Sequence, residues 1–451
     1  MRAVVDVELP ETECFGDRLV TAVREGSIEE SAVNTAARRH LRQKAAAGLL
    51  GDCAPDPAST AVGDAFGTDA VGSLARRAAR RSQVLLHDDG VLPLPADASV
   101  VVVGPNADAP RNLLGNYSYA GAENESGGVD VITPLAALRD RTEVTHERGC
   151  GVRAGPDDDL AVAVTAADDA DVTVACVGGQ SGIDVERDSP GTAGEALDRA
   201  DLGLPGRQPD LVERVAAVDT PLVVVVVGGR PLALPEVVDA ADATLLAWLP
   251  GQEGGTAIAD VLFGADPGGR LPVSLPRTAG QLPIHYRRDA VSRGDYVFTE
   301  GSPLFPFGHG ESYARFAYGA LSVAPAAIPT DGGTTVSVPV ENVGARPGTE
   351  VVQLYAGGFE AAGVRPAREL VGFARVDLQA GERATVAFDL AAATLSAHDG
   401  SGVRRIAPGQ LDLLVGRSAG DVRGRHALEL TGDARVPAEF VPLATSTVTI
   451  E

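Results

Sequence analysis

Between residues 69 and 263 the hydrophobic positions follow two alternating patterns. Short runs of Val, Leu and Ala bounded by Gly or Pro predict buried strands at 83–86, 99–104, 171–177, 222–227 and 243–248. Helical periodicity predicts helices between or beside them at 69–82, 133–141, 158–167, 208–218 and 255–263. Strands that alternate with helices favour a parallel sheet covered on both faces, so an α/β sandwich is expected over residues 69–314.

From about residue 315 the pattern changes to short strands in which apolar and polar residues alternate. Such strands are predicted at 334–340, 350–355, 369–373, 384–390 and 410–416, with turn residues between them. This pattern is typical of an all-β sandwich of the immunoglobulin type, which we place at 315–434. We expect residues 435–451 to form a loose tail.

The first 68 residues carry too few elements for a domain of their own. A strand is predicted at 3–10 and helices at 17–25 and 27–49, with Ser27 and Glu30 forming a capping box. One strand and two helices cannot bury a core, so residues 1–50 are expected to be the end of a larger unit. Residues 51–68, rich in Pro, Gly and Asp, predict a linker.

The chain is strongly acidic, with a net charge of -24, and Lys44 is its one lysine. A nucleic-acid partner is disfavoured because phosphate binding needs a basic face. An acidic surface favours a salt-adapted protein; the alternative is compositional drift in a GC-rich genome, which also replaces Lys by Arg. The longest apolar run, 221–227, is too short to span a bilayer, so no membrane partner is expected.

The cysteines are scattered, without metal-type spacing, and the histidines form no cluster. We therefore expect free thiols and neither a metal nor another cofactor. Free thiols fit a reducing compartment, and the acidic N-terminus does not resemble a secretion signal. These two observations predict a cytoplasmic protein. The cysteines are Cys14, Cys53, Cys150 and Cys176.

The connection between the strand at 171–177 and the helix at 208–218 is long and rich in Gly and Asp. Loops that follow the carboxyl ends of strands carry the chemistry in open α/β sheets, and a long loop in a compact domain is usually functional. This loop holds two glutamates with no lysine nearby, Glu186 and Glu195. Both are candidates for acid/base chemistry.

Several motifs together resemble glycoside hydrolase family 3, the β-glucosidase and β-xylosidase group. His87 departs from the family pattern, which has Lys or Arg there. The likeness runs in order along essentially the whole chain. The matching stretches are 84–94, 104–108, 114–117, 194–208, 250–264, 269–272, 306–310, 369–373 and 408–409.

The resemblance implies a (β/α)₈ barrel, an α/β sandwich and a fibronectin type III-like domain. In the family the barrel supplies an Asp nucleophile in a Ser-Asp-Trp-like motif, and the sandwich supplies the acid/base. The only tryptophan here is Trp248, inside the sandwich. A barrel takes about 250 residues, so the chain looks like the C-terminal part of such an enzyme, with residues 1–50 as the barrel's last remnant.

By the same resemblance Glu195 matches the acid/base of the family's G-E-G-x-D-R motif, although Ala196 replaces a glycine. Glu186 is the alternative, and a surface ion pair of Glu195 with Arg199 is the non-catalytic interpretation. Asp6 and Glu8 would lie where a barrel strand contacts sugar, or would serve only in capping or solvation.

The implied function is that of a retaining, exo-acting β-glycosidase acting on a β-linked oligosaccharide or glycoside. This chain would supply the acid/base loop but not the nucleophile. A separately encoded barrel subunit would complete the site. The alternatives are a non-catalytic carbohydrate-binding or scaffold protein and an inactive remnant. The sequence leaves open whether the chain forms a homo-oligomer.

Overall fold

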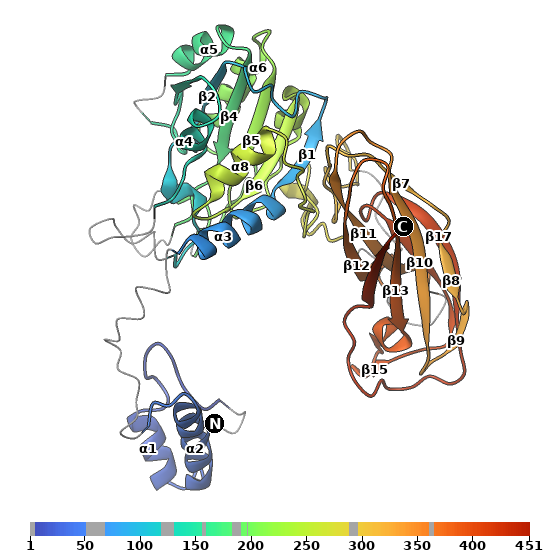
Figure 1. Ribbon diagram of the computed structural model, residues 1–451. Coiled ribbons are helices and arrows are strands. Elements are labelled where there is room, and N and C mark those ends of the chain that lie inside the picture. The colour runs from blue at the N-terminus through green and yellow to red at the C-terminus, as the bar shows by residue number, and fades with distance from the viewer. Residues whose placement is uncertain are drawn as a thin grey trace. The chain divides into compact units, whose positions relative to one another are not determined.

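The computed structural model describes residues 5–50, 68–118, 130–155, 159–182, 191–195, 197–287, 296–359 and 365–451. The chain forms two units, Met1–Thr68 and Asp69–Glu451 (Figure 1). No helix in the described ranges is long and apolar enough to cross a membrane. We describe each unit by itself.

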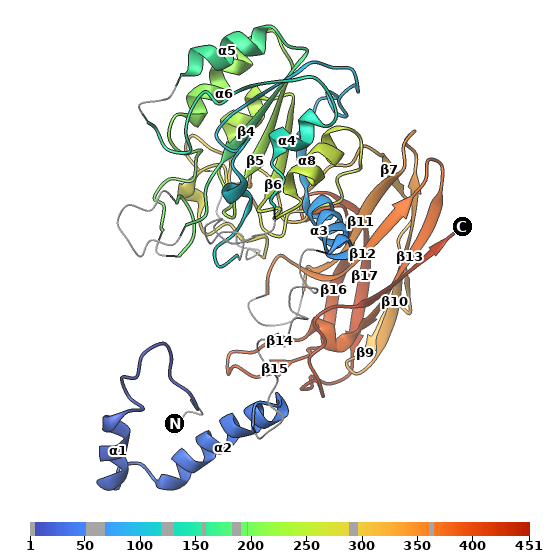
Figure 2. The same cartoon turned by 60° about the vertical axis from the view of Figure 1, so that its left-hand side comes forward.

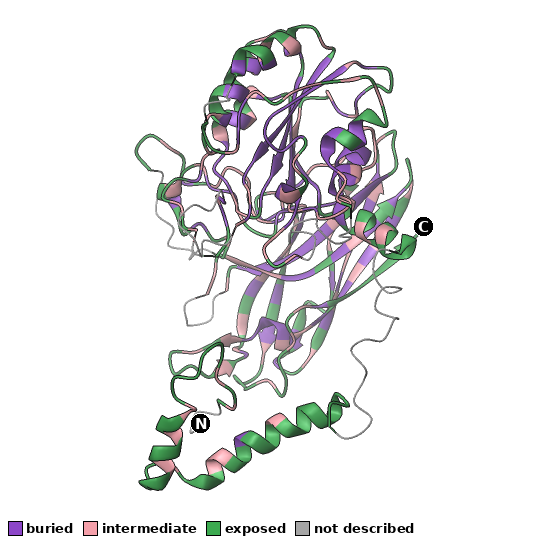
Figure 3. Ribbon diagram, turned by 90° about the vertical axis from the view of Figure 1, so that its left-hand side faces the viewer, coloured by how far each residue is buried: buried purple, intermediate pink, exposed green. Residues whose placement is uncertain are grey.

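The described part of the N-terminal unit, residues 5–50 and 68, holds two helices, α1 (Asp17–Arg24) and α2 (Glu30–Ala46). The strand expected at 3–10 is wrong for residues 5–10, which are irregular because no neighbouring strand pairs with them. The capping box is also wrong, since α2 begins at Glu30 and its N-cap residue is Glu29 rather than Ser27. Both helices are largely exposed (Figure 3), and a barrel origin for this unit stays a prediction.

The second unit begins with the α/β domain, which confirms the predicted sandwich. Its sheet has six strands in the order β1-β6-β5-β4-β2-β3. All neighbours are parallel except β1, which runs antiparallel to β6. The strands are β1 (Val84–Asp88), β2 (Val100–Val103), β3 (Val144–Glu147), β4 (Val172–Gly178), β5 (Leu222–Val227) and β6 (Ala243–Trp248).

Helices cover both faces of this sheet (Figure 2). One apolar core lies between the sheet and α5, α6 and α7, and a second lies between the sheet and α4 and α8. Strands β2, β4 and β5 are buried throughout because both faces are covered. The helices are α3 (Asp69–Ser82), α4 (Pro134–Arg139), α5 (Leu160–Asp168), α6 (Gln208–Ala216), α7 (Pro235–Ala240) and α8 (Gly254–Leu262).

The β domain is a sandwich of two mainly antiparallel sheets around one apolar core. One sheet has the order β18-β13-β10-β7, with β8 also paired to β10, and the other has the order β12-β11-β16-β17-β9. The strands are β7 (Phe316–Tyr318), β8 (Ser322–Ala324), β9 (Ala327–Pro329), β10 (Gly333–Asn342), β11 (Gly348–Gly357), β12 (Arg368–Leu378), β13 (Arg383–Ala391), β16 (Gly409–Gly416), β17 (Val422–Thr431) and β18 (Thr445–Ile450), beside a small hairpin of β14 (Ala397–His398) and β15 (Arg404–Arg405).

The expectation of a loose tail at 435–451 is wrong for residues 445–450. Residues 445–450 form β18, which pairs antiparallel with β13 from Ala384 to Asp389. The pattern Thr-Ser-Thr-Val-Thr-Ile hid this strand, because every residue of β18 is exposed and its stability comes from backbone pairing rather than burial.

A buried ion cluster ties the β domain to the α/β domain. Glu350 of β11 is fully buried and accepts from Arg270 at 3.0 Å and from Arg417 at 3.0 Å. Arg270 comes from the α/β domain, in the Gly-Arg-Leu-Pro motif that follows α8. Beside this cluster, Asp266 accepts hydrogen bonds from the backbone N–H of Thr349 and from the Ser312 hydroxyl. The two domains of this unit therefore share buried polar interactions.

Candidate active site

The strand order of the α/β domain reverses between β2 and β4. The chain passes from β2 outward to β3 and then crosses back to β4 on the other side of β2. In an open parallel sheet, the crevice outside the carboxyl ends of the strands at such a reversal is the usual place for a ligand. The loop that follows β4 leaves from this crevice.

Two glycines determine the backbone conformation of this loop. Gly178 ends β4 with φ of 126°, and a Cβ atom there would lie 1.9 Å from the carbonyl oxygen of Val227. Gly194 also has φ of 126°, and its Cβ would lie 2.0 Å from the carbonyl oxygen of Gly182. Any side chain would collide at both positions, so the loop can turn back against its own start only with glycine there.

Glu195 directly follows this second glycine and is exposed. The Tyr117 hydroxyl donates a hydrogen bond to Glu195 Oε2. This hydrogen bond and the carboxylate charge raise the pKa of the Tyr117 phenol. Next to it, Asn116 Nδ2 donates to the Gly182 carbonyl at 3.0 Å. Two motifs of the family resemblance, 114–117 and 194–208, therefore meet in space at the candidate acid/base.

Arginines hold the backbone of the loop on either side of Glu195. Arg153 donates to the Gly191 carbonyl, Arg230 donates to the Leu197 carbonyl at 2.8 Å, and Arg199 donates to the Gly203 carbonyl at 2.7 Å. The non-catalytic ion pair between Glu195 and Arg199 is not formed. Arg199 instead braces the loop.

The far end of the motif anchors the loop to the sheet. Gln208, fully buried at the start of α6, accepts from the Gly178 N–H at 2.6 Å and donates to the Gly178 carbonyl at 2.9 Å. The side chain thereby satisfies both backbone groups where β4 ends. It also holds the start of α6 against the end of β4, so both ends of the loop between them are fixed.

The other predicted site residues lie elsewhere. Glu186 lies outside the described residues. In the N-terminal unit, Asp6 pairs with Arg39 at 3.2 Å. Glu8 accepts from the backbone N–H groups of Phe15 and Cys14, and these bonds, the one from Phe15 above all, lower its pKa. Both carboxylates have internal partners, and their sugar contacts stay a prediction.

Sequence reasoning missed the part played by Asn116 and Tyr117. The available signal was a tyrosine beside an Asn in a stretch of low hydrophobicity, because an exposed aromatic in a loop often marks a binding surface. Tyr117 is 82% exposed and adopts φ of 61°, which is rare for a residue other than glycine. A backbone in this rarely populated region that carries an exposed aromatic side chain is the kind of feature found at functional sites.

The described residues contain no group of three or more His, Cys, Asp or Glu that could hold a metal. The loop itself offers a carboxyl group on a braced backbone, with a phenol hydrogen bonded to it. Such a group can donate a proton to a bound molecule and take it back.

Comparison with known proteins identifies the two domains of the second unit. Residues 83–313 match the glycosyl hydrolase family 3 C-terminal domain, and residues 350–419 match a fibronectin type III-like domain. The α/β domain and the β domain are thus those of this family's C-terminal part. The chain belongs to glycoside hydrolase family 3.

Relatives match over most of this chain. A periplasmic β-glucosidase of Salmonella typhimurium is 33% identical over 94% of the chain and 59% of its own length. A β-xylosidase of Formosa agariphila is 34% identical over 86% of the chain and 54% of its own length. A mutant β-glucosidase of Listeria innocua, crystallised in complex with laminaribiose, superimposes with a TM-score of 0.86 at 30% identity, covering 95% of the chain and 59% of its own. The chain spans somewhat more than half of each.

Proposed function

We propose that this chain supplies the acid/base loop of a retaining, exo-acting β-glycosidase, a β-glucosidase or β-xylosidase, with Glu195 as the acid/base. The observation that carries the proposal is the position of Glu195. It follows a glycine that no other residue could replace, on a loop held by three arginines at the carboxyl edge of the sheet.

In the first step of this chemistry, Glu195 gives its proton to the glycosidic oxygen while the bond from that oxygen to the anomeric carbon breaks and a nucleophilic carboxylate bonds to the carbon. In the second step, the Glu195 carboxylate takes a proton from water as the water oxygen bonds to the carbon and the ester breaks. Tyr117, by donating to Oε2, would orient the carboxyl group so that its other oxygen faces the substrate.

The two carboxyl groups of a retaining site lie about 5 to 5.5 Å apart. We propose that the nucleophile belongs to a (β/α)₈ barrel outside these 451 residues. Sequencing about 200 codons upstream of the Met1 codon, the remaining length of a barrel of about 250 residues, tests this directly. A frame encoding a Ser-Asp-Trp-like motif supports the proposal, and unrelated sequence favours carbohydrate binding or a decayed remnant.

The role of Glu195 is tested on the enzyme reconstituted with that barrel. Glu195→Gln should lower kcat/KM for alkyl β-glucosides about 10² to 10⁴-fold. It should change kcat/KM little for dinitrophenyl β-glucoside, whose leaving group needs no proton. Azide, a nucleophile that needs no base, should restore kcat on the activated substrate. Glu213→Gln, at an exposed carboxylate on α6, is the matched control and should behave as wild type.

Equal loss on both substrates would mean that Glu195 is structural. Full activity of Glu195→Gln on alkyl glycosides would remove the assignment, and Glu186→Gln would then be the variant to measure. Comparing glucosides with xylosides in the same assay decides the sugar.

The cytoplasmic location stays a prediction. Its support is the free thiols of Cys14 and Cys176, against a periplasmic relative. Fractionation of cells with an antibody against this chain tests it: recovery with periplasmic markers would overturn the prediction. Size-exclusion chromatography of the same material decides between monomer and homo-oligomer.

A further inference from the structure

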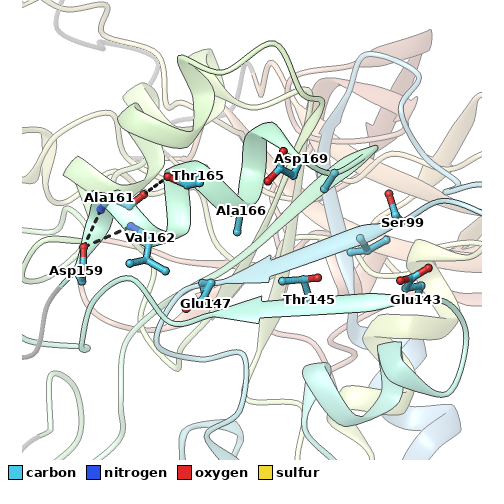
Figure 4. Close-up of a pocket in the computed structure, with 12 residues that line it drawn as sticks. Ser99, Glu143, Thr145, Glu147, Asp159, Ala161, Val162, Thr165, Ala166 and Asp169 are labelled. Atoms are coloured by element: carbon cyan, nitrogen blue, oxygen red, sulfur yellow. Dashed lines mark hydrogen bonds between the residues drawn. The ribbon is translucent and has the colours of Figure 1, made fainter.

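The edge strand β3 separates two pockets of opposite charge. On its α5 side, a pocket of about 570 Å³ is lined by Thr145 and Glu147 of β3 and by residues of α5 (Figure 4). This first pocket is acidic, and its carboxylates would repel an anion. They are Glu143, Glu147, Asp159 and Asp169.

The second pocket, of about 510 Å³, lies on the opposite face of β3, because successive strand residues point to opposite faces. His146 lines it, whereas its neighbours Thr145 and Glu147 line the first pocket. The second pocket also receives residues that follow β2 and β4. It therefore occupies the crevice where the strand order reverses, the expected place for a ligand in this type of sheet.

The charged side chains of the second pocket are mainly cationic. Arg148 and Arg153 line it, and among the lining residues that the structure describes Asp108 is the one carboxylate and Gln180 is a further polar group. A basic pocket is unusual on a chain whose net charge is -24. The net negative charge of the chain repels anions. Two arginines in one pocket offset this repulsion locally and make the pocket a place where an anion can bind.

Two polar groups in this pocket lack partners. The guanidinium of Arg148 makes no hydrogen bond or ion pair with any residue that the structure describes, and His146 Nε2 is buried without a partner there. Burial lowers the pKa of His146, while Asp108 opposes the shift. A buried nitrogen without a partner costs free energy unless a ligand or water satisfies it.

We propose that this second pocket binds a small oxyanion, a phosphate or a carboxylate group, through Arg148 and Arg153. Guanidinium groups recognise both by paired, charge-assisted hydrogen bonds. Asp108 accepts from the Thr133 hydroxyl at 2.9 Å and keeps its negative charge. The attraction for an anion therefore comes from the two arginines, which outnumber this one carboxylate among the described residues of the lining.

The site is joined to the loop that carries Glu195. Arg153 donates to the Gly191 carbonyl, and the Gln180 N–H donates to the Thr192 hydroxyl at 3.0 Å. An anion that holds Arg153 would therefore stiffen the base of the loop. This link is a consequence of the proposal and is not needed for its test.

The test measures binding to the 451-residue chain by calorimetry at low ionic strength, because salt screens the attraction. Inorganic phosphate and glucuronate are the two anionic probes, and glucose is the neutral control. We expect at least one anion to bind and Arg148→Ala to weaken that binding about tenfold or more, as the loss of a charge-assisted contact predicts. Arg214→Ala, at an exposed arginine on α6 outside both pockets, should bind as wild type.

The identity of the anion that binds decides between a phosphate and a carboxylate ligand. If neither phosphate nor glucuronate gives a heat of binding, the proposal is overturned. It is equally overturned if Arg148→Ala binds as tightly as Arg214→Ala, or if glucose binds as well as the anions. Because Arg148 is exposed, its replacement should leave the far-UV circular dichroism unchanged, so lost binding cannot be assigned to unfolding.

Discussion

The buried cluster around Glu350 gives the sharpest prediction about stability. The side chain of Glu350 is 0% exposed and that of Arg270 is 7% exposed, so neither charge is hydrated in the fold. Glu350→Gln keeps the shape but removes the charge, and it leaves the Arg270 guanidinium buried and uncompensated. Breaking a buried pair in this way costs about 3 to 5 kcal/mol.

Arg417 is 25% exposed and stays partly hydrated. We therefore expect Glu350→Gln to lower the free energy of unfolding by about 3 to 4 kcal/mol, at the lower side of that range. The matched control is Glu341→Gln on β10, where the side chains of Glu341 and its partner Arg383 are 35% and 54% exposed. An exposed pair is worth about 0 to 1 kcal/mol. Both variants remove one carboxylate charge from the same β domain.

Urea unfolding is the assay, because urea, unlike guanidinium chloride, does not screen ion pairs. Trp248 is the only tryptophan and lies in the α/β domain, so its fluorescence follows that domain while circular dichroism follows both. We expect the wild-type transitions to coincide because the buried ion cluster couples the two domains. In Glu350→Gln the circular dichroism should change at lower urea than the fluorescence. Equal losses for Glu350→Gln and Glu341→Gln, with coincident transitions, would refute the reasoning.

Three further outcomes are expected. Asp260→Asn should lower the free energy of unfolding by about 1 to 2 kcal/mol in urea, since Arg76 and Arg141 lose their partner but remain partly hydrated; an effect below that of Glu341→Gln would contradict it. Burial lowers the pKa of His309, so its stabilising contribution is complete above the unfolded pKa of about 6.5 and is lost as pH falls below it. Unfolding measured from about pH 7 to pH 5 should show a smaller slope in His309→Asn, and a slope equal to that of the wild type would count against this role. If the acidic surface is a salt adaptation, the melting temperature should rise up to molar KCl, and indifference to KCl would leave compositional drift as the explanation.

Much of the α/β domain was predictable because its strands are buried on both faces. A continuous apolar run such as Leu222–Val227 is typical of a strand at the centre of a parallel sheet, where both faces are covered. Strand β3 escaped prediction because it is a four-residue edge strand whose two faces line pockets, so Val-Thr-His-Glu carries no apolar run. Helix α7 is only six residues long, too short for a periodic signal.

The candidate site also has one part that the sequence predicts and one part that it does not. Glu195 could be selected from its own loop, because glycines and carboxylates mark that loop locally. The contact from Tyr117 joins residues 78 positions apart, and no local pattern reports a contact between two irregular segments. The pocket with Arg148 likewise depends on three strand ends that meet only in the folded sheet.

The pairing of β18 with β13 has a consequence for synthesis. Strand β13 leaves the ribosome about sixty residues before its outer neighbour, and until then its edge offers unpaired N–H and C=O groups to other nascent chains. The β domain therefore completes its sheet only after residue 450 has emerged. Removing residues 445–451 leaves the edge of β13 unpaired also in the finished sheet, so it should favour aggregation during and after synthesis.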